Sequence, residues 1–148
     1  MSANLQAQTT PYAPAYAGSG NPTLLAVARI LIAALFLVAG VRKLLGYAGT
    51  VGYFTKLGFP AADAVAVLAI VIEIGGALLL IAGWRTRLTA WVLVAFVAVA
   101  TAMAHRFWEF EAAQQVNQMN HVLKNLAVIG GLIFVASFGP GRLSVDKT

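Results

Sequence analysis

The chain has 148 residues, of which 60% are hydrophobic and only 10% are charged. A water-soluble domain usually has about a quarter of its residues charged, because its surface must face water. We therefore predict an all-α protein that crosses a membrane as a four-helix bundle. The formal net charge is +5, but no basic stripe with interleaved aromatic residues is present, so nucleic-acid binding is not expected. The chain has no cysteine, which excludes disulfides, thiol redox chemistry and Cys-ligated metal centres within it.

Residues 1–22 are polar, small and rich in Pro and Gly, with no charged side chain. They lack the positive and apolar regions of a secretory signal. We expect a disordered tail here that ends where Pro22 starts the first helix. A transmembrane domain is expected over residues 23–140, followed by a short polar tail over residues 141–148.

Four apolar runs follow the first tail, and each is long enough to cross a hydrocarbon core of about 30 Å as a helix. Helices are expected near residues 23–45, 63–83, 88–106 and 120–139. The segment 46–62 and the segment before the fourth helix carry aromatic residues, which suit the membrane interface. We predict interfacial loops there, after the first and third helices.

Four spans place both chain ends on one side of the membrane, together with the turn between the second and third helices. We call this side the terminal face, and the side of the two interfacial loops the loop face. Lys and Arg residues occur on both faces, but Arg85 and Arg87 lie together in the short turn. This turn favours a cytoplasmic location for the two termini.

Ionisable side chains inside a span cost about 2.5–3.5 kcal/mol each at the bilayer centre, so their depth matters. Lys43 ends the first expected helix, His105 ends the third and Lys124 begins the fourth, which places all three near the loop face. Glu73 should lie roughly 15 Å below that face, and Arg29 roughly 21 Å below it. The difference of about 6 Å is within reach of an arginine side chain, so an Arg29–Glu73 ion pair is our first expectation. Lys43 and Lys124 are the rival partners for Glu73.

Lys43, His105, Lys124 and Asn125 are further expected to line one polar pocket above Glu73. With Arg29, these residues form the candidate ligand site, because intramembrane charges mark binding sites and ion pathways by default. The alternative is a structural role, in which the polar cluster fixes helix register and the lysines extend to the headgroups.

His105 and His121 both fall at the loop face, so a bis-His haem is conceivable there. The spacing of the two histidines fits no metal-binding motif, and neither a metal nor a resident cofactor is expected. No phosphate-binding loop, dinucleotide fingerprint or nucleophile elbow occurs in the sequence. The chain therefore has no self-sufficient catalytic motif.

The order of several short motifs resembles the DoxX family over about residues 23–146. These are Arg29, the runs AGVRKLLG, EIGGALLLIAGWRTR and LKNLAVIGGLI, and the Gly-Pro-Gly that ends the last span. The resemblance implies a four-helix protein of a prokaryotic inner membrane. It carries over five motif positions, which are Lys43, Glu73, His105, Lys124 and Asn125.

The name-giving member of that family is a small subunit of an archaeal thiosulfate:quinone oxidoreductase, and mycobacterial relatives are linked to a membrane-associated oxidoreductase complex. The resemblance thus implies a membrane subunit or partner of a redox complex that contacts quinone. Its expected partners are the lipid bilayer and the subunits of such a complex, or a second copy of the chain. The alternative is a non-enzymatic binder of a lipid or small hydrophobic solute, or a membrane anchor for a partner protein.

Overall fold

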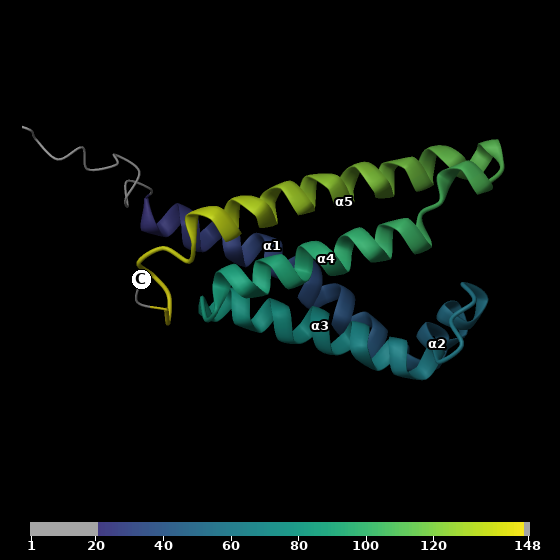
Figure 1. Cartoon of the computed structure of the whole chain (residues 1–148), viewed down its shortest axis with the longest axis horizontal. Helices are drawn as coiled ribbons and strands as arrows, with labels where there is room; N and C mark the ends of the chain where they lie inside the picture. The colour runs from purple at the N-terminus through teal and green to yellow at the C-terminus, as the bar shows by residue number, and fades with distance from the viewer. Residues whose placement is uncertain (1–20, 147–148) are drawn as a thin grey trace, which may run out of the picture.

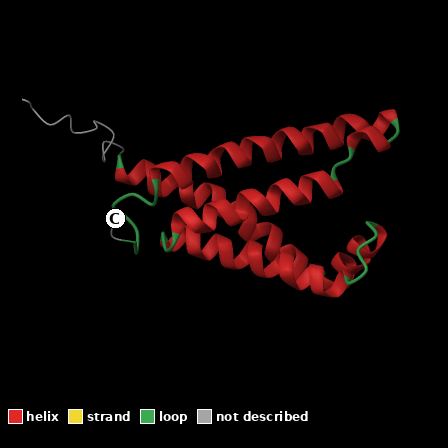
Figure 2. Cartoon of the chain, in the orientation of Figure 1, coloured by secondary structure: helices red, strands yellow, loops and turns green. Residues whose placement is uncertain are grey.

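Residues 21–146, which the computed structural model describes, form helices and no strands (Figures 1 and 2). In chain order the elements are α1 (Pro22–Leu45), α2 (Tyr47–Lys56), α3 (Ala62–Ala82), α4 (Thr86–Ala104), the short 3-10 helix η1 (Phe107–Glu109) and α5 (Ala112–Phe138). Helices α1, α3, α4 and α5 are long and apolar enough to cross a membrane. The prediction of an all-α, four-helix membrane bundle is confirmed.

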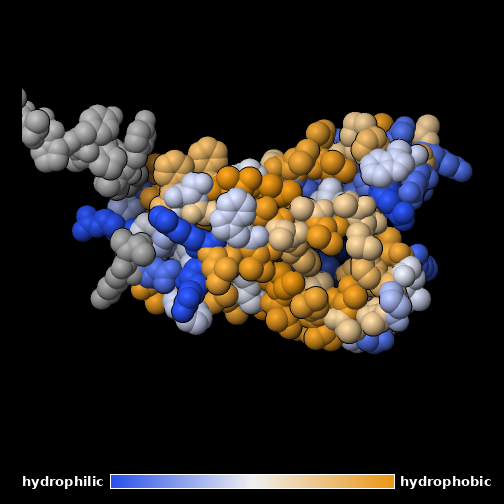
Figure 3. Space-filling model, viewed as in Figure 1, coloured by the Kyte–Doolittle hydropathy of each residue, from blue (hydrophilic) through white to orange (hydrophobic). Residues whose placement is uncertain are grey.

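The four long helices are arranged as two pairs. Helix α1 packs chiefly on α3, α4 packs chiefly on α5, and the contact between α3 and α4 joins the pairs. Figure 1 shows that the pairs lie close together at the terminal face, beside the C-terminus, and diverge toward the loop face. The loops are confined to the ends of the helices (Figure 2), and an orange hydrophobic belt separates two bluer ends (Figure 3). This distribution of hydropathy suits a protein that spans a bilayer.

Local sequence sets where the helices begin and end. Asn21 caps α1, because its side-chain oxygen accepts a hydrogen bond from the Thr23 amide at 2.9 Å, and Pro22 follows as the first helical residue. Helix α3 ends at Ala82 and is capped by Gly83, which adopts the left-handed conformation with φ of 69°. Only glycine takes up this conformation without steric cost.

The two connecting segments on the loop face contain more helix than expected. The first includes α2, which packs against α3. The fourth transmembrane helix begins at Ala112 rather than near residue 120. The expected start was placed where the apolar run begins. The alanines and glutamines at 112–115 are good helix formers, however, and they extend the same helix toward its N-terminus.

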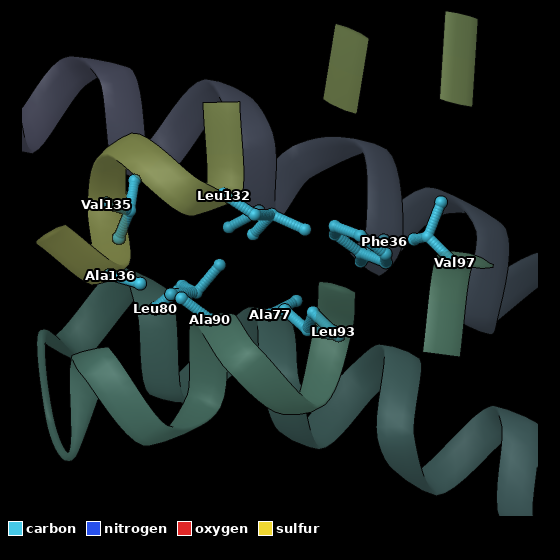
Figure 4. Packing of buried hydrophobic residues seen from close by; sticks show 10 residues of the cluster. Phe36, Ala77, Leu80, Ala90, Leu93, Val97, Leu132, Val135 and Ala136 are labelled. Carbon is cyan, nitrogen blue, oxygen red and sulfur yellow. The ribbon is translucent and has the colours of Figure 1, made fainter. Parts of the chain in front are cut away.

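The apolar core lies in the half of the bundle nearest the terminal face. Leu80, Leu93 and Leu132 are fully buried there, and Phe36 is almost so. Figure 4 shows these side chains meeting from all four long helices, with alanines between them. The helices are therefore held together at one end, and side-chain packing leaves space between them toward the other.

The segment after α5 crosses the terminal face and is attached to the turn after α3. The Val145 amide donates to the Ala82 carbonyl and the Asp146 amide to the Gly83 carbonyl, each at 3.0 Å. The Asp146 carboxylate accepts a hydrogen bond from the Thr86 amide at 3.2 Å, at the start of α4. A carboxylate is favourable at this position because it faces the positive end of the helix dipole. Residues 1–20, which include nearly all of the expected N-terminal tail, lie outside the described residues.

Candidate ligand site between the helix pairs

A cavity of about 850 Å³ opens between the two helix pairs in the half of the bundle nearest the loop face. Most of its wall is apolar, and Figure 3 shows hydrophilic atoms in a hollow of the hydrophobic belt. The structure brings five of the six predicted site residues to this cavity: Lys43, Glu73, His105, Lys124 and Asn125. They come from all four long helices or their ends, so only the folded bundle assembles them.

Lys43 and Glu73 form an ion pair between α1 and α3. The Lys43 Nζ lies 2.7 Å from Glu73 Oε1 and 2.8 Å from Oε2, so one ammonium group contacts both carboxylate oxygens. Glu73 is buried. The two helices approach closely here because residue 40 is glycine; a Cβ on Gly40 would lie 3.0 Å from Glu73 Cβ. This close approach brings the lysine within reach of the carboxylate.

The first-choice pairing of Arg29 with Glu73 was wrong, and the rival Lys43 is the partner. Glu73 lies level with Gly40, and Arg29 lies about 16 Å further along α1 at 1.5 Å per residue. The depth estimate failed because it measured both residues from the helix ends rather than from their point of contact. Arg29 instead donates to the Pro140 carbonyl and, at 2.8 Å, to the Leu143 carbonyl. It is buried at the terminal face, away from the cavity.

Asn125 is held on the opposite wall of the cavity by a short chain of hydrogen bonds. Its Nδ2 donates to Thr101 Oγ1 at 2.8 Å, and the Thr101 hydroxyl donates to the Val97 carbonyl at 2.6 Å. Because α5 begins earlier than expected, Asn125 lies well inside this helix rather than near its start. The amide oxygen of Asn125 makes no hydrogen bond with residues 21–146, so it can accept one from a ligand.

His105 caps the C-terminal end of α4 and borders the cavity at the loop face. Its Nδ1 lies 2.8 Å from Gln118 Oε1, and its ring stacks on His121 with 4.9 Å between centroids and 19° between planes. Nitrogen lone pairs lie in the ring planes, so two stacked rings do not direct them at an iron between them. Among residues 21–146, no group of three His, Asp or Glu side chains could hold a metal ion.

Sequence reasoning missed several residues of the cavity wall. Arg42, Tyr53, Phe54, Phe59 and Phe96 all line it. Three of these aromatics were expected at the interface, but nothing in the sequence indicated that α2 and the loop after it would turn them toward the polar cluster. Phe54 and Phe59 meet edge to face at 5.6 Å. Partial burial raises the pKa of the Tyr53 phenol, so its hydroxyl stays protonated at neutral pH and can donate a hydrogen bond.

The cavity carries an excess of positive charge. All five acidic residues of the chain lie within the described part of it, and the only one that lines the cavity is Glu73. Glu73 already forms an ion pair with Lys43. Neither Arg42 nor Lys124 has a carboxylate within 4.0 Å among residues 21–146. These two cations remain available to a ligand that carries negative charge or hydrogen-bond acceptors.

Comparison with known proteins agrees with this architecture. The model of the DoxX family matches residues 24–106. The chain belongs to the DoxX family. This match includes Lys43, Glu73 and His105 and ends before α5, so it covers only part of the cavity wall.

Relatives that extend over most of this DoxX-family chain are membrane proteins. Inner membrane protein YphA of Escherichia coli K12 is 34% identical over 131 residues, which are 88% of this chain and 93% of the relative. Inner membrane protein YqjF of the same organism is 37% identical over 121 residues, or 82% of this chain and 88% of the relative. An uncharacterized membrane protein of Mycobacterium tuberculosis is 31% identical over 135 residues, or 86% and 82%. No solved structure matches this chain.

Proposed function

We propose that this DoxX-family protein is a membrane subunit of a quinone-linked redox complex and binds the quinone headgroup in the cavity between its helix pairs. The observation that carries the proposal is the placement of a polar cluster from four helices inside an apolar, aromatic-walled cavity. Its volume of about 850 Å³ is within the range of small-molecule sites in proteins, roughly 300–1,000 Å³. A site on two diverging helix pairs is also open to a ligand dissolved in the bilayer.

The chemistry of the wall suits a quinone. A quinone has a flat ring with two carbonyl acceptors, and the Lys124 ammonium and the Tyr53 hydroxyl can donate to such acceptors. The rings of Phe54 and Phe59 offer apolar surface for the headgroup. Electrons would come from a partner subunit, because the sequence has no cysteine and no motif for a redox cofactor of its own.

A second candidate function is the binding of an anionic lipid in the same cavity, without redox chemistry. The observation that favours it is the excess positive charge of Arg42 and Lys124. A phosphate group would neutralise these two cations more completely than a quinone carbonyl does.

Replacing Lys124 by glutamine should reduce quinone retention roughly tenfold, because the ligand loses a charge-assisted hydrogen bond. The measurement is the amount of quinone and of each phospholipid that copurifies with the full chain from its native membrane, determined by mass spectrometry after solvent extraction. Ala100→Phe should also expel the ligand, because Ala100 lines the cavity.

Two matched variants control for charge and bulk. Lys56→Gln removes an exposed loop-face cation, and Ala98→Phe adds the same ring to an exposed part of α4; neither residue lines the cavity. Both should retain quinone as the unaltered chain does. If an anionic phospholipid instead copurifies with the unaltered chain and is lost in the two cavity variants, the second candidate function is established. Equal retention of quinone in all four variants would leave Lys124 as an anchor that extends to the headgroups.

We further propose that the terminal face is cytoplasmic, because Arg85, Arg87 and Arg142 lie there in or beside short connections. The chain lacks cysteine, so single cysteines at Lys56 and Arg142 can be labelled selectively. A membrane-impermeant maleimide should label Lys56→Cys in intact spheroplasts and Arg142→Cys only after the membrane is opened. The reverse pattern would place the termini outside, and labelling of both from one side would contradict the four-span topology.

A further inference from the structure

A second hollow, of about 520 Å³, lies between α3 and α4 toward the terminal face. Its wall is almost entirely apolar, and none of the polar residues of the candidate quinone cavity contributes to it. Gly75 and Gly76 lie along α3 in this hollow, and Trp84 and Arg85 lie at its end. We call it the α3–α4 groove.

The two adjacent glycines have different effects on the groove. A Cβ on Gly76 would lie 2.9 Å from a methyl carbon of Leu93, so this glycine lets α3 and α4 pack closely. A Cβ on Gly75 would meet no atom within 4 Å, so this glycine leaves the groove unfilled. Along α3, the stretch from Val71 to Leu79 that borders the groove is about 12 Å long at 1.5 Å per residue. This is close to the depth of one leaflet's hydrocarbon, about 15 Å or half the bilayer core.

The terminal end of the groove carries an aromatic ring and an exposed cation. Trp84 is exposed, as suits an indole at the membrane–water interface. Arg85 is exposed as well, and no carboxylate lies within 4.0 Å of it in the described part of the chain. An apolar channel of one-leaflet length that ends in an exposed guanidinium is complementary to one molecule with a tail and an acidic head.

We propose that the α3–α4 groove binds an anionic phospholipid of the leaflet at the terminal face, with one acyl chain along Gly75 and the phosphate against Arg85. A second copy of this chain fits the groove less well. In a symmetric dimer with the groove at its interface, both Arg85 side chains would lie at the same depth within one interface. Like charges that face each other at a membrane interface repel, whereas an acidic headgroup neutralises Arg85.

The test uses Trp84 as a reporter in the full chain with Trp91→Phe and Trp108→Phe, reconstituted in phosphatidylcholine nanodiscs. Brominated phosphatidylglycerol or brominated phosphatidylcholine is added as a minor component, and quenching of Trp84 fluorescence is measured. A site with one dedicated cation should enrich the anionic lipid at Trp84 roughly fivefold over the neutral lipid. Arg85→Gln and Gly75→Leu should each abolish this preference, the first by removing the charge and the second by filling the groove.

Two controls separate the groove from the rest of the surface. Arg142→Gln removes another exposed cation of the terminal face, and Gly130→Leu adds the same side chain on α5, where a Cβ also meets no atom within 4 Å. Both should keep the preference. Equal quenching by the two lipids in the starting protein would overturn the proposal, as would a preference that survives Arg85→Gln or disappears equally in Arg142→Gln. Disulfide-linked dimers of the Gly75→Cys variant in membranes would overturn it in favour of a second copy.

Discussion

Replacing Lys43 by methionine should lower the free energy of unfolding by about 3–5 kcal/mol, the usual cost of removing one partner of a buried ion pair. The change leaves the Glu73 carboxylate buried between α1 and α3 with no cation, since Lys43 is its only ion-pair partner among residues 21–146. The expected result is a large fall in thermal stability, measured in detergent or nanodiscs by loss of helical circular dichroism.

The double variant Lys43→Met with Glu73→Leu distinguishes the loss of the pair from the loss of each side chain. It should regain most of the stability, because apolar residues of similar volume often replace a buried ion pair at little cost. Lys56→Met, which removes an exposed lysine outside the cavity, should have almost no effect. If the double variant loses as much free energy of unfolding as the two single variants lose together, Lys43 and Glu73 have no coupling energy.

Replacing Arg29 by methionine should lower the free energy of unfolding by about 2–6 kcal/mol, because two buried or partly buried carbonyl groups each lose a charged donor. These carbonyls belong to Pro140 and Leu143, in the segment that crosses the terminal face. We expect faster amide hydrogen exchange at Val145 and Asp146, whose hydrogen bonds to the turn after α3 depend on the position of this segment. Hydrogen–deuterium exchange with mass spectrometry measures the effect directly.

Arg29→Lys should recover only part of the loss, because an ammonium group cannot reproduce the forked geometry of a guanidinium that contacts two carbonyls. Arg42→Met is the matched control on the same helix, since Arg42 makes no side-chain hydrogen bond to residues 21–146. It should leave exchange in segment 139–146 unchanged. If exchange there is equally slow in Arg29→Met, Arg29 does not hold the segment in place.

One arginine and one lysine of α1 have different roles. Arg29 attaches the end of the chain to the terminal face, at the tightly packed end of the bundle. Lys43 lies at the open end and neutralises the carboxylate at the cavity wall.

The membrane-spanning architecture could be predicted from the sequence because its physical cause is local. An apolar run of about 20 residues has one stable form in lipid, since every backbone group must find its partner within the segment. Helices α1, α3 and α4 accordingly begin and end within two residues of the expected positions. The start of α5 was missed because polar helix formers such as Gln114 and Gln115 extend a helix without leaving any signal in hydropathy.

The sequence by itself also indicated that Lys43, His105 and Lys124 share the loop-face half, because each lies near the loop-face end of an apolar run. It could not determine which of them touch, because contact depends on the rotation and close approach of whole helices. The missing Cβ of Gly40 brings α1 against α3 beside Glu73, and this selects Lys43 over Arg29. The orientation of α2, which brings Tyr53 and Phe54 to the cavity, was likewise decided by tertiary packing. An aromatic ring at the membrane interface is stable whether it faces lipid or protein, so its sequence position does not indicate the orientation.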